Sequence, residues 1–368
     1  MQSKTVFITG LAILSLCVVG CSPSDEPSAG EEVTQSRASA EPQRELPTDF
    51  TELDDGAKYA GDLVDNKKHG FGVYVWPNGD RYEGEWKNDV MSGQGKFIDT
   101  KGRVYEGEWQ DGKYHGQGTY KWPSGSIYTG GFKHGKKSGK GTYRWADGRV
   151  YVGEFSNDKK NGFGTYEWPD GRKYSGRFVN DARTGQGKMV QPDGEIYEGS
   201  FVDGVQEGKG TATYADGSVY EGDFKDDMKS GVGELKWASG EVYKGEFRND
   251  APNGEGVMRW PNGDVYRGEF VSGVMHGRGV FRFADGRVYD GEFKDGKRSG
   301  KGSLEWPSGE RYIGDFKNGM QEGRGTFEWP DGSKYVGGFS NNQLHGRGSC
   351  STAGQTVQCR FDQGVRIE

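Results

Sequence analysis

The 368-residue sequence has few of the residues that build catalytic and metal sites. It contains five histidines and four cysteines, and neither type forms a cluster with the spacing of metal ligands. Hydrophobic residues make up only 32% of the chain, whereas glycine contributes 65 residues, which is a poor composition for a conventional layered core. The Gly-x-Gly pairs lack an adjoining helix, so their context argues against a phosphate-binding loop. We therefore expect no enzyme activity and no cofactor.

Net charge is also scarce over most of the chain. Ten acidic and three basic residues precede Lys58, and this difference equals the whole net charge of −7. The remaining sequence is therefore close to neutral. A surface without net charge has no general attraction to nucleic acid or anionic lipid headgroups. We expect no nucleic-acid partner and no direct membrane contact through this part of the chain.

A long apolar run occurs only once, from Val6 to Val19, after a single basic residue, Lys4. Its length is typical of a signal peptide and short for a membrane-spanning helix. The run leads into Val-Val-Gly immediately before Cys21, which resembles a bacterial lipobox. The resemblance implies that residues 1–20 are a lipoprotein signal peptide and that acyl chains such as palmitate are attached to Cys21. An uncleaved anchor and an ordinary signal peptide are the alternatives.

The residues after Cys21 predict where the protein is held. Ser22 stands where many inner-membrane lipoproteins have Asp, so the same resemblance implies the outer membrane, facing the periplasm. Several acyl chains hold a protein on a membrane more stably than one. Residues 21–57 are rich in Ser, Pro, Glu and Asp, and this composition predicts a disordered acidic tether after the acylated cysteine.

The rest of the chain is dominated by a strict repeat of 23 residues. A tyrosine is followed two residues later by glycine and then by a second aromatic residue, as in Tyr82, Gly84 and Trp86. The thirteen repeated tyrosines are Tyr59, Tyr82, Tyr105, Tyr128, Tyr151, Tyr174, Tyr197, Tyr220, Tyr243, Tyr266, Tyr289, Tyr312 and Tyr335. Such a period identifies a repeat array. Each copy contains two strand-like segments separated by turn residues, which predicts a β-hairpin.

Alternation along a strand assigns side chains to the two faces of the predicted sheet. Tyr105, Gly107 and Trp109 share one face, and Glu106 and Glu108 share the other. Packing is the first interpretation of the aromatic rows, and ligand binding is a second interpretation compatible with it. The candidate binding face consists of Tyr82, Trp86, Tyr105, Trp109, Trp122, Trp145, Trp168, Trp237, Trp260, Trp306 and Trp329.

The pattern Tyr-Glu-Gly-Glu-Trp, followed by Gly-x-Gly-x-Tyr-x-Trp, is nearly intact over residues 105–125 and resembles the MORN-repeat family. The resemblance implies an all-β fold, with residues 58–348 forming an elongated, single-layer antiparallel sheet of tandem hairpins. It also implies an interaction module that can dimerise. The repeat is weakest over residues 177–214, where a bend, a partner contact and sequence drift all remain open.

Residues 349–368 form a degenerate last repeat, which we expect to cap the array because terminal repeats need protection. Cys350 stands where the preceding repeat has an aromatic residue, and Cys359 lies near the position of a repeated glycine. In an oxidising envelope compartment these two cysteines are expected to form a disulfide across neighbouring strands.

The histidines favour no metal site. His69, His115, His276 and His345 precede Gly-x-Gly at the same repeat position, and His134 lies in a turn. Neighbouring members of the set are at least two repeats apart, or roughly 19 Å by strand spacing. No two of them are therefore expected to bind one metal.

The sequence thus predicts a non-catalytic, lipid-anchored MORN-repeat scaffold at the bacterial cell envelope. Its partner would be another protein or a second copy, and it would contact the membrane through the lipid anchor only. The alternative is binding of an envelope ligand, a glycan or a choline-like group, in a groove between aromatic rings and glycines.

Overall fold

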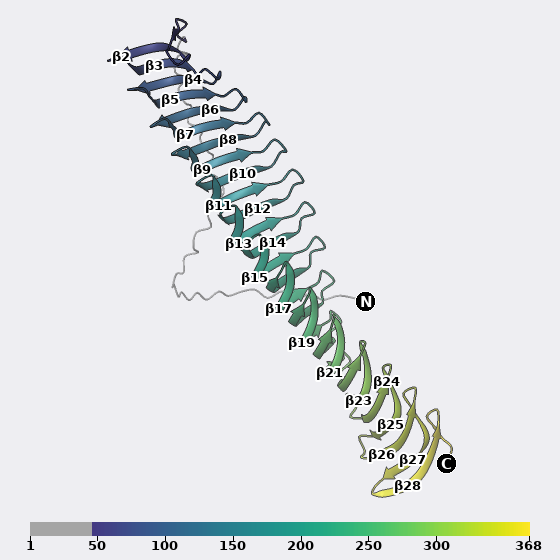
Figure 1. Cartoon of the computed structure of the whole chain (residues 1–368). Helices are drawn as coiled ribbons and strands as arrows, with labels where there is room; N and C mark the ends of the chain where they lie inside the picture. Colours follow the sequence, from purple (N-terminus) through teal and green to yellow (C-terminus); the bar gives the residue numbers. More distant parts are fainter. Residues whose placement is uncertain (1–45) are drawn as a thin grey trace, which may run out of the picture. The chain divides into compact units, whose positions relative to one another are not determined.

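The computed structural model of the chain describes residues 46–368. In this part of the chain it contains 29 β-strands and no helix, and all strands belong to one open antiparallel sheet (Figure 1). The predicted all-β fold of tandem hairpins is therefore confirmed. The predicted signal peptide, Cys21 and most of the predicted tether lie outside the described residues. The chain divides into the units Met1–Leu46 and Pro47–Glu368, and the second contains the sheet.

Each strand pairs with the strands before and after it in the sequence. β2 (Lys58–Val64) pairs with β3 (Lys67–Val75), β3 with β4 (Arg81–Lys87), and β4 with β5 (Val90–Ile98). The following strands are β6 (Val104–Gln110), β7 (Lys113–Lys121), β8 (Ile127–Lys133), β9 (Lys136–Arg144), β10 (Val150–Ser156), β11 (Lys159–Glu167), β12 (Lys173–Val179), β13 (Ala182–Val190), β14 (Ile196–Val202), β15 (Val205–Thr213), β16 (Val219–Lys225), β17 (Met228–Lys236), β18 (Val242–Arg248), β19 (Ala251–Arg259), β20 (Val265–Val271), β21 (Val274–Arg282), β22 (Val288–Lys294), β23 (Lys297–Glu305), β24 (Arg311–Lys317), β25 (Met320–Glu328), β26 (Lys334–Ser340), β27 (Gln343–Thr352), β28 (Gln355–Asp362) and β29 (Val365–Arg366).

The sheet starts earlier than the predicted boundary at residue 58. The short strand β1 (Thr51–Glu52) pairs with β2, with Thr51 opposite Tyr59 and Glu52 opposite Lys58. Ala57, in the connecting turn, is fully buried. The prediction that the tether continues to residue 57 was therefore wrong at its last residues. Period counting missed this strand because it precedes the first complete copy of the motif.

Tight turns close the hairpins. In the turn between β4 and β5, Asn88 and Asp89 have φ angles of 48° and 68°. Two consecutive left-handed residues form the turn type whose twist suits a β-hairpin, and Asn and Asp tolerate this conformation. The turn is also bonded to the previous hairpin, because the Asp89 carboxylate accepts the Lys68 backbone N–H at 2.9 Å.

Paired glycines run across the sheet from strand to strand. Gly84 lies opposite Gly72 on one side and opposite Gly95 on the other. A Cβ on Gly95 would lie 2.3 Å from the hydroxyl oxygen of Tyr82. Only glycine therefore leaves room for the tyrosine ring, which lies over the glycine pair. We call this row, from Gly61 to Gly348, the glycine ladder.

The repeated tyrosines form the core on one face of the sheet. Tyr82 is fully buried, and its ring makes edge-to-face contacts with Trp86 and Trp109, each at a centroid distance of 5.1 Å. The same arrangement recurs in the later repeats and ends where Phe361 contacts Tyr335 at 5.1 Å. From Tyr82 onward, each tyrosine therefore joins the aromatic residue of its own repeat to that of the next. In the first repeat Leu63 stands at the position of this aromatic residue. We call this row of rings the aromatic column.

A bulge in each hairpin bends the longer strand. Between β4 and β5 the register changes from Gly84 opposite Gly95 to Trp86 opposite Met91. Extra residues on one strand of a pair bend that strand and increase its twist, and Figure 1 shows the curved strands. The Glu85 carboxylate accepts the Gln94 N–H within this bulge at 3.0 Å. The acid of the repeat motif thus satisfies a backbone donor that the ladder leaves unpaired.

Candidate binding surfaces

The predicted aromatic binding face is largely the core of the sheet. Tyr82, Trp86, Tyr105 and Trp109 are at most 6% exposed, so they present almost no surface to a ligand. The other seven tryptophans of the candidate face are partly buried and pack against the same core: Trp122, Trp145, Trp168, Trp237, Trp260, Trp306 and Trp329. Only these seven retain some accessible ring surface.

The tyrosine hydroxyl groups are hydrogen-bond donors inside this core. The Tyr243 hydroxyl donates to the carbonyl oxygen of Glu246 at 2.9 Å. Burial, with a smaller effect of the Glu246 charge, raises the pKa of Tyr243 to about 12. The hydroxyl therefore stays protonated at neutral pH and keeps its carbonyl partner.

Cations of the chain itself cover several of the rings. The Lys137 ammonium lies 4.8 Å from the centroid of Tyr143, and that of Lys160 lies 5.4 Å from the centroid of Tyr166. Burial lowers the pKa of Lys137. Since a quaternary ammonium ligand would need the open faces of such rings, a choline-like group would compete here with lysines already in place.

Two hollows interrupt the aromatic side. One, of about 300 Å³, is lined by Trp76, Phe97 and Trp109 among others. The second, of about 330 Å³, lies in the weak repeats, where Gln191 and Ala212 contribute to its lining. These two residues stand where other repeats have large rings. Over residues 177–214 the loss of the consensus residues therefore opens a small cavity without interrupting the strand pairing.

The opposite, polar face carries the larger hollows, which follow the glycine ladder. They have volumes of about 1140 Å³ within residues 117–211, about 560 Å³ within residues 186–244, and about 860 Å³ within residues 278–358. Ladder glycines and the alternate side chains of the strands line all three. We call these hollows together the polar groove. Its first part exposes Phe163 and Val152 among threonines, with 66% of Phe163 accessible.

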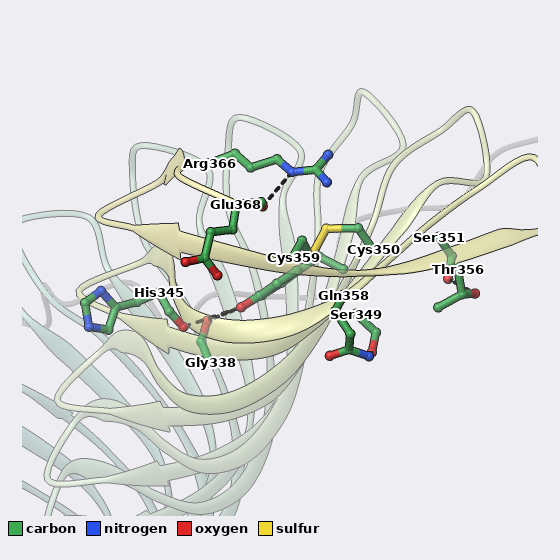
Figure 2. Close-up of a disulfide and its surroundings, with 11 residues drawn as sticks. Gly338, His345, Ser349, Cys350, Ser351, Thr356, Gln358, Cys359, Arg366 and Glu368 are labelled. Carbon is green, nitrogen blue, oxygen red and sulfur yellow. Dashed lines mark hydrogen bonds between the residues drawn. A yellow bond between two sulfur atoms is a disulfide. The ribbon is translucent and has the colours of Figure 1, made fainter.

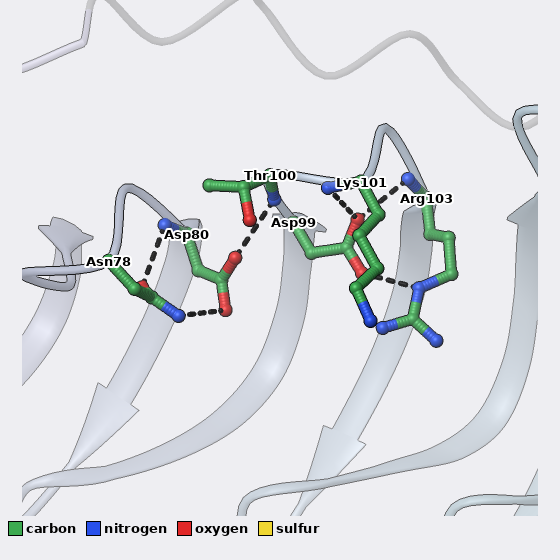
Figure 3. Close-up of polar contacts among 6 residues, drawn as sticks. All are labelled: Asn78, Asp80, Asp99, Thr100, Lys101 and Arg103. Carbon is green, nitrogen blue, oxygen red and sulfur yellow. Dashed lines mark hydrogen bonds and ion pairs between the residues drawn. The ribbon is translucent and has the colours of Figure 1, made fainter.

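Hydrogen bonds join neighbouring turns at the strand ends, along one side of the sheet (Figure 3). The Asp80 carboxylate accepts the Thr100 N–H at 2.9 Å, which joins two successive turns. Asp99 occupies a position where most repeats have tryptophan, and it accepts the backbone N–H groups of Lys101 and Arg103 at 3.0 and 2.8 Å. Partial burial opposes ionisation of Asp99, but these bonds and the Arg103 side chain hold its pKa below the ordinary value.

The predicted disulfide is present between Cys350 and Cys359, whose Cα atoms are 5.9 Å apart (Figure 2). Cys359 lies opposite Gly348 and so occupies the next position of the glycine ladder. The bridge lies on the aromatic side, where other repeats place a tyrosine ring over the ladder. On the other side of the same strands, the Gln358 amide donates to the Ser349 hydroxyl at 3.2 Å.

The structure adds one histidine pair that the spacing argument missed. His115 lies on β7 and His134 in the turn between β8 and β9, and their ring centroids are 5.7 Å apart. Distances were compared only among histidines at equal repeat positions, which left out His134. Residues 46–368 contain no group of three or more His, Cys, Asp or Glu residues placed to hold a metal ion. No helix in that range is long and apolar enough to cross a membrane.

Comparison with known families gives matches along nearly the whole sheet. The model of the MORN repeat matches residues 59–81, 82–102, 105–127, 128–148, 151–171, 174–196, 197–219, 220–242, 243–265, 266–286, 289–311, 312–334 and 335–356. These segments coincide with the predicted copies. The comparison with curated proteins gives no match.

Solved structures with similar segments are distant. The TCP10 domain of Danio rerio CPAP, in complex with a peptide of Danio rerio STIL, is 16% identical over 73% of this chain and 98% of that chain, with a TM-score of 0.21. Virginiamycin B lyase from Staphylococcus aureus is 10% identical over 82% of this chain and 98% of that chain, with a TM-score of 0.13. With TM-scores this low, neither similarity supports an inference.

Proposed function

The chain belongs to the MORN-repeat family, and we propose that it is a non-catalytic scaffold, lipid-anchored at Cys21, that binds a protein partner or a second copy at the bacterial cell envelope. The proposal rests on a difference between the two faces of the sheet. The aromatic rings and glycines pack into the core of the array, whereas the polar groove on the other face is open to solvent along the sheet. A long repeated surface of this kind suits an extended partner.

The lipid anchor is supported by the sequence before the sheet, namely the apolar run and the lipobox-like residues that end at Cys21. The test is metabolic labelling with palmitate in a bacterial host, followed by membrane fractionation of the full chain. Cys21→Ala should abolish the label and release the protein from membranes, whereas Cys17→Ala, within the predicted signal peptide, should leave both unchanged. A labelled, membrane-bound Cys21→Ala variant would contradict the anchor.

The partner is tested by photo-crosslinking in cells. A photoreactive residue at Phe163 or Val232, both exposed on the polar face, should form a defined crosslinked product. The matched control is Val274, which is 44% exposed at a hairpin turn and should give no product. Mass spectrometry then distinguishes a second copy from another protein. Products of equal yield at all three sites would indicate random contact and would contradict a specific binding face.

The alternative function, ligand binding between aromatic rings and glycines, would have to use one of the two small hollows on the aromatic side, beside Trp76 and Phe97 or beside Ala212. Elsewhere the tyrosine rings lie over the glycine ladder. Tryptophan fluorescence during titration with peptidoglycan fragments, lipopolysaccharide and choline tests this alternative, and an unchanged spectrum with all three would remove it.

A further inference from the structure

The polar groove changes in charge toward its C-terminal end. The hollow within residues 278–358 is lined by five basic side chains and one acidic side chain. The charged residues that line it are Arg278, Lys301, Arg311, Arg324, Arg347 and Asp290. The hollow within residues 186–244 contains two lysines and three glutamates. The same backbone thus carries opposite charge balances in two stretches of one groove.

Ion pairing neutralises two of the five cations of the C-terminal stretch and leaves three without an acidic partner among residues 46–368. In the C-terminal stretch, Lys301 pairs with Asp315, and the Arg311 Nε lies 3.0 Å from Glu305. Three exposed arginines of this stretch form no ion pair with any residue of 46–368: Arg278, Arg324 and Arg347. These three stand at the same position of their repeats. Since one repeat advances two strands of about 4.8 Å each, Arg324 and Arg347 are about 10 Å apart, and Arg278 lies two repeats, or roughly 19 Å, from Arg324.

Acidic side chains near these arginines accept backbone hydrogen bonds. The carboxylate of Glu292, which lies opposite Arg278, accepts the Lys301 N–H at 3.2 Å. The Glu269 carboxylate accepts the Arg278 backbone N–H at 3.1 Å, and the Asp315 carboxylate accepts that of Arg324 at 3.0 Å. These carboxylates support the bulges of their hairpins. The three arginine side chains therefore line the groove without an acidic partner in the part of the chain that the structure describes.

The floor and walls of this stretch indicate what kind of molecule would fit. Its floor is the glycine ladder, whose backbone groups already pair within the sheet, so a peptide cannot add a strand there. The hydroxyl groups of Ser303 and Thr326 line the groove beside Ile313 and Val336, which are 42% and 52% exposed. The surface thus combines hydroxyl groups, small apolar patches and a row of guanidinium groups.

From these features we propose that the C-terminal polar groove binds a linear acidic polysaccharide, with acid groups of the sugar chain on Arg278, Arg324 and Arg347. Guanidinium groups bind carboxylates and phosphates in a bidentate geometry. The serine and threonine hydroxyls suit sugar hydroxyls, and Ile313 and Val336 suit the apolar faces of sugar rings. This site is independent of the protein-binding role proposed above, since either can fail without the other.

The binding test uses the purified full chain and fluorescently labelled alginate oligosaccharides, which are linear and carry one carboxylate per sugar. Two probes of matched length accompany them: neutral dextran oligosaccharides and poly-L-glutamate. We expect saturable binding of alginate that weakens as salt rises, because exposed charges are screened. Equal binding of dextran would overturn the role of charge, and equal binding of poly-L-glutamate would overturn the preference for a glycan. Failure of alginate to bind would overturn the site.

A matched pair of triple variants locates the site. Arg278→Gln/Arg324→Gln/Arg347→Gln should weaken alginate binding by about tenfold or more, given the usual size of exposed ion pairs. The control is Lys188→Gln/Lys209→Gln/Lys244→Gln, which removes the same number of cations from the central groove, where each is paired with an acid. Equal losses in the two variants would show that only net charge matters and would overturn the proposal. Thermal unfolding should be similar for both.

Discussion

The two faces of this sheet follow different rules. On the aromatic side the tyrosines are the same in every repeat and nearly all are fully buried. On the polar side the residue one position after each tyrosine varies freely, from Glu106 through Val152 to Lys244 and Ile313. The backbone and one face therefore hold the fold, whereas the other face can change its chemistry from repeat to repeat. Specificity in such an array is therefore local.

Removing one ring of the aromatic column should cause the greatest loss of stability. Tyr243 contacts Phe247 and Phe270 at centroid distances of 5.1 and 5.0 Å. Tyr243→Ala should destabilise the surrounding hairpins by about 3–5 kcal/mol, the usual cost of removing a buried large ring. The control is Lys244→Ala on the opposite face, which removes only an exposed ion pair and should cost under about 1 kcal/mol. Hydrogen exchange across β17–β20 measures both losses, and similar protection in the two variants would show that the two faces contribute equally to stability.

Removing the disulfide at the C-terminal end of the aromatic side should cause the next greatest loss of stability. Replacing both Cys350 and Cys359 by serine should cost about 2–4 kcal/mol in the last hairpin, the typical contribution of a disulfide. Because stability in a repeat array is local, hydrogen exchange should accelerate in β27 and β28 and stay unchanged in β10 and β11. Uniform acceleration along the whole sheet would contradict this localisation. Before substitution, the oxidised protein should show no free thiol at these positions.

A glycine of the ladder gives the third test. A Cβ on Gly256 would lie 2.4 Å from the Tyr243 hydroxyl oxygen, so Gly256→Ala should cost about 1–3 kcal/mol through overpacking. In the double variant with Tyr243→Ala, the methyl group finds space and the two losses should not add. Chemical unfolding of the four proteins of this cycle measures the coupling. Additive losses would show that the tyrosine ring is not the reason for glycine.

The smallest effect concerns a repeat that departs from the consensus. Asp99→Asn should cost about 1 kcal/mol at neutral pH, since it weakens the hydrogen bonds within the turn. The pKa of Asp99 is lowered in the folded protein, so its contribution is present above the unfolded value of about 3.9 and is lost as pH falls through the folded pKa. Thermal unfolding at neutral and acidic pH should show the two proteins converging in acid. A constant difference would contradict this role.

Much of this architecture could be predicted from spacing alone. The fixed distance from Tyr105 to Gly107 and Trp109 assigned all three to one face, and the structure confirms it. The disulfide followed from placing Cys350 and Cys359 on the repeat pattern. These predictions succeeded because alternation along a strand is a local property that a sequence records directly.

Other features depend on curvature, which the period does not encode. The bulge beside Gly93 bends its strand, and this bending helps to explain how Tyr82 is fully buried in a single sheet. The Lys137 ammonium over the Tyr143 ring and the contact between His115 and His134 also join residues of different strands and turns, and the period alone does not show these contacts. The candidate face was chosen by residue type, and so it included Trp86, which is only 5% exposed.

The meander has a consequence for how such a chain is made. Every described strand bonds only to the strands just before and just after it in the sequence, so no segment waits for a partner synthesised much later. Hairpins can close one by one as the polypeptide emerges from a ribosome or a translocation channel. Growth by duplication is equally simple, because a further unit of 23 residues lengthens the structure without rearranging anything already built.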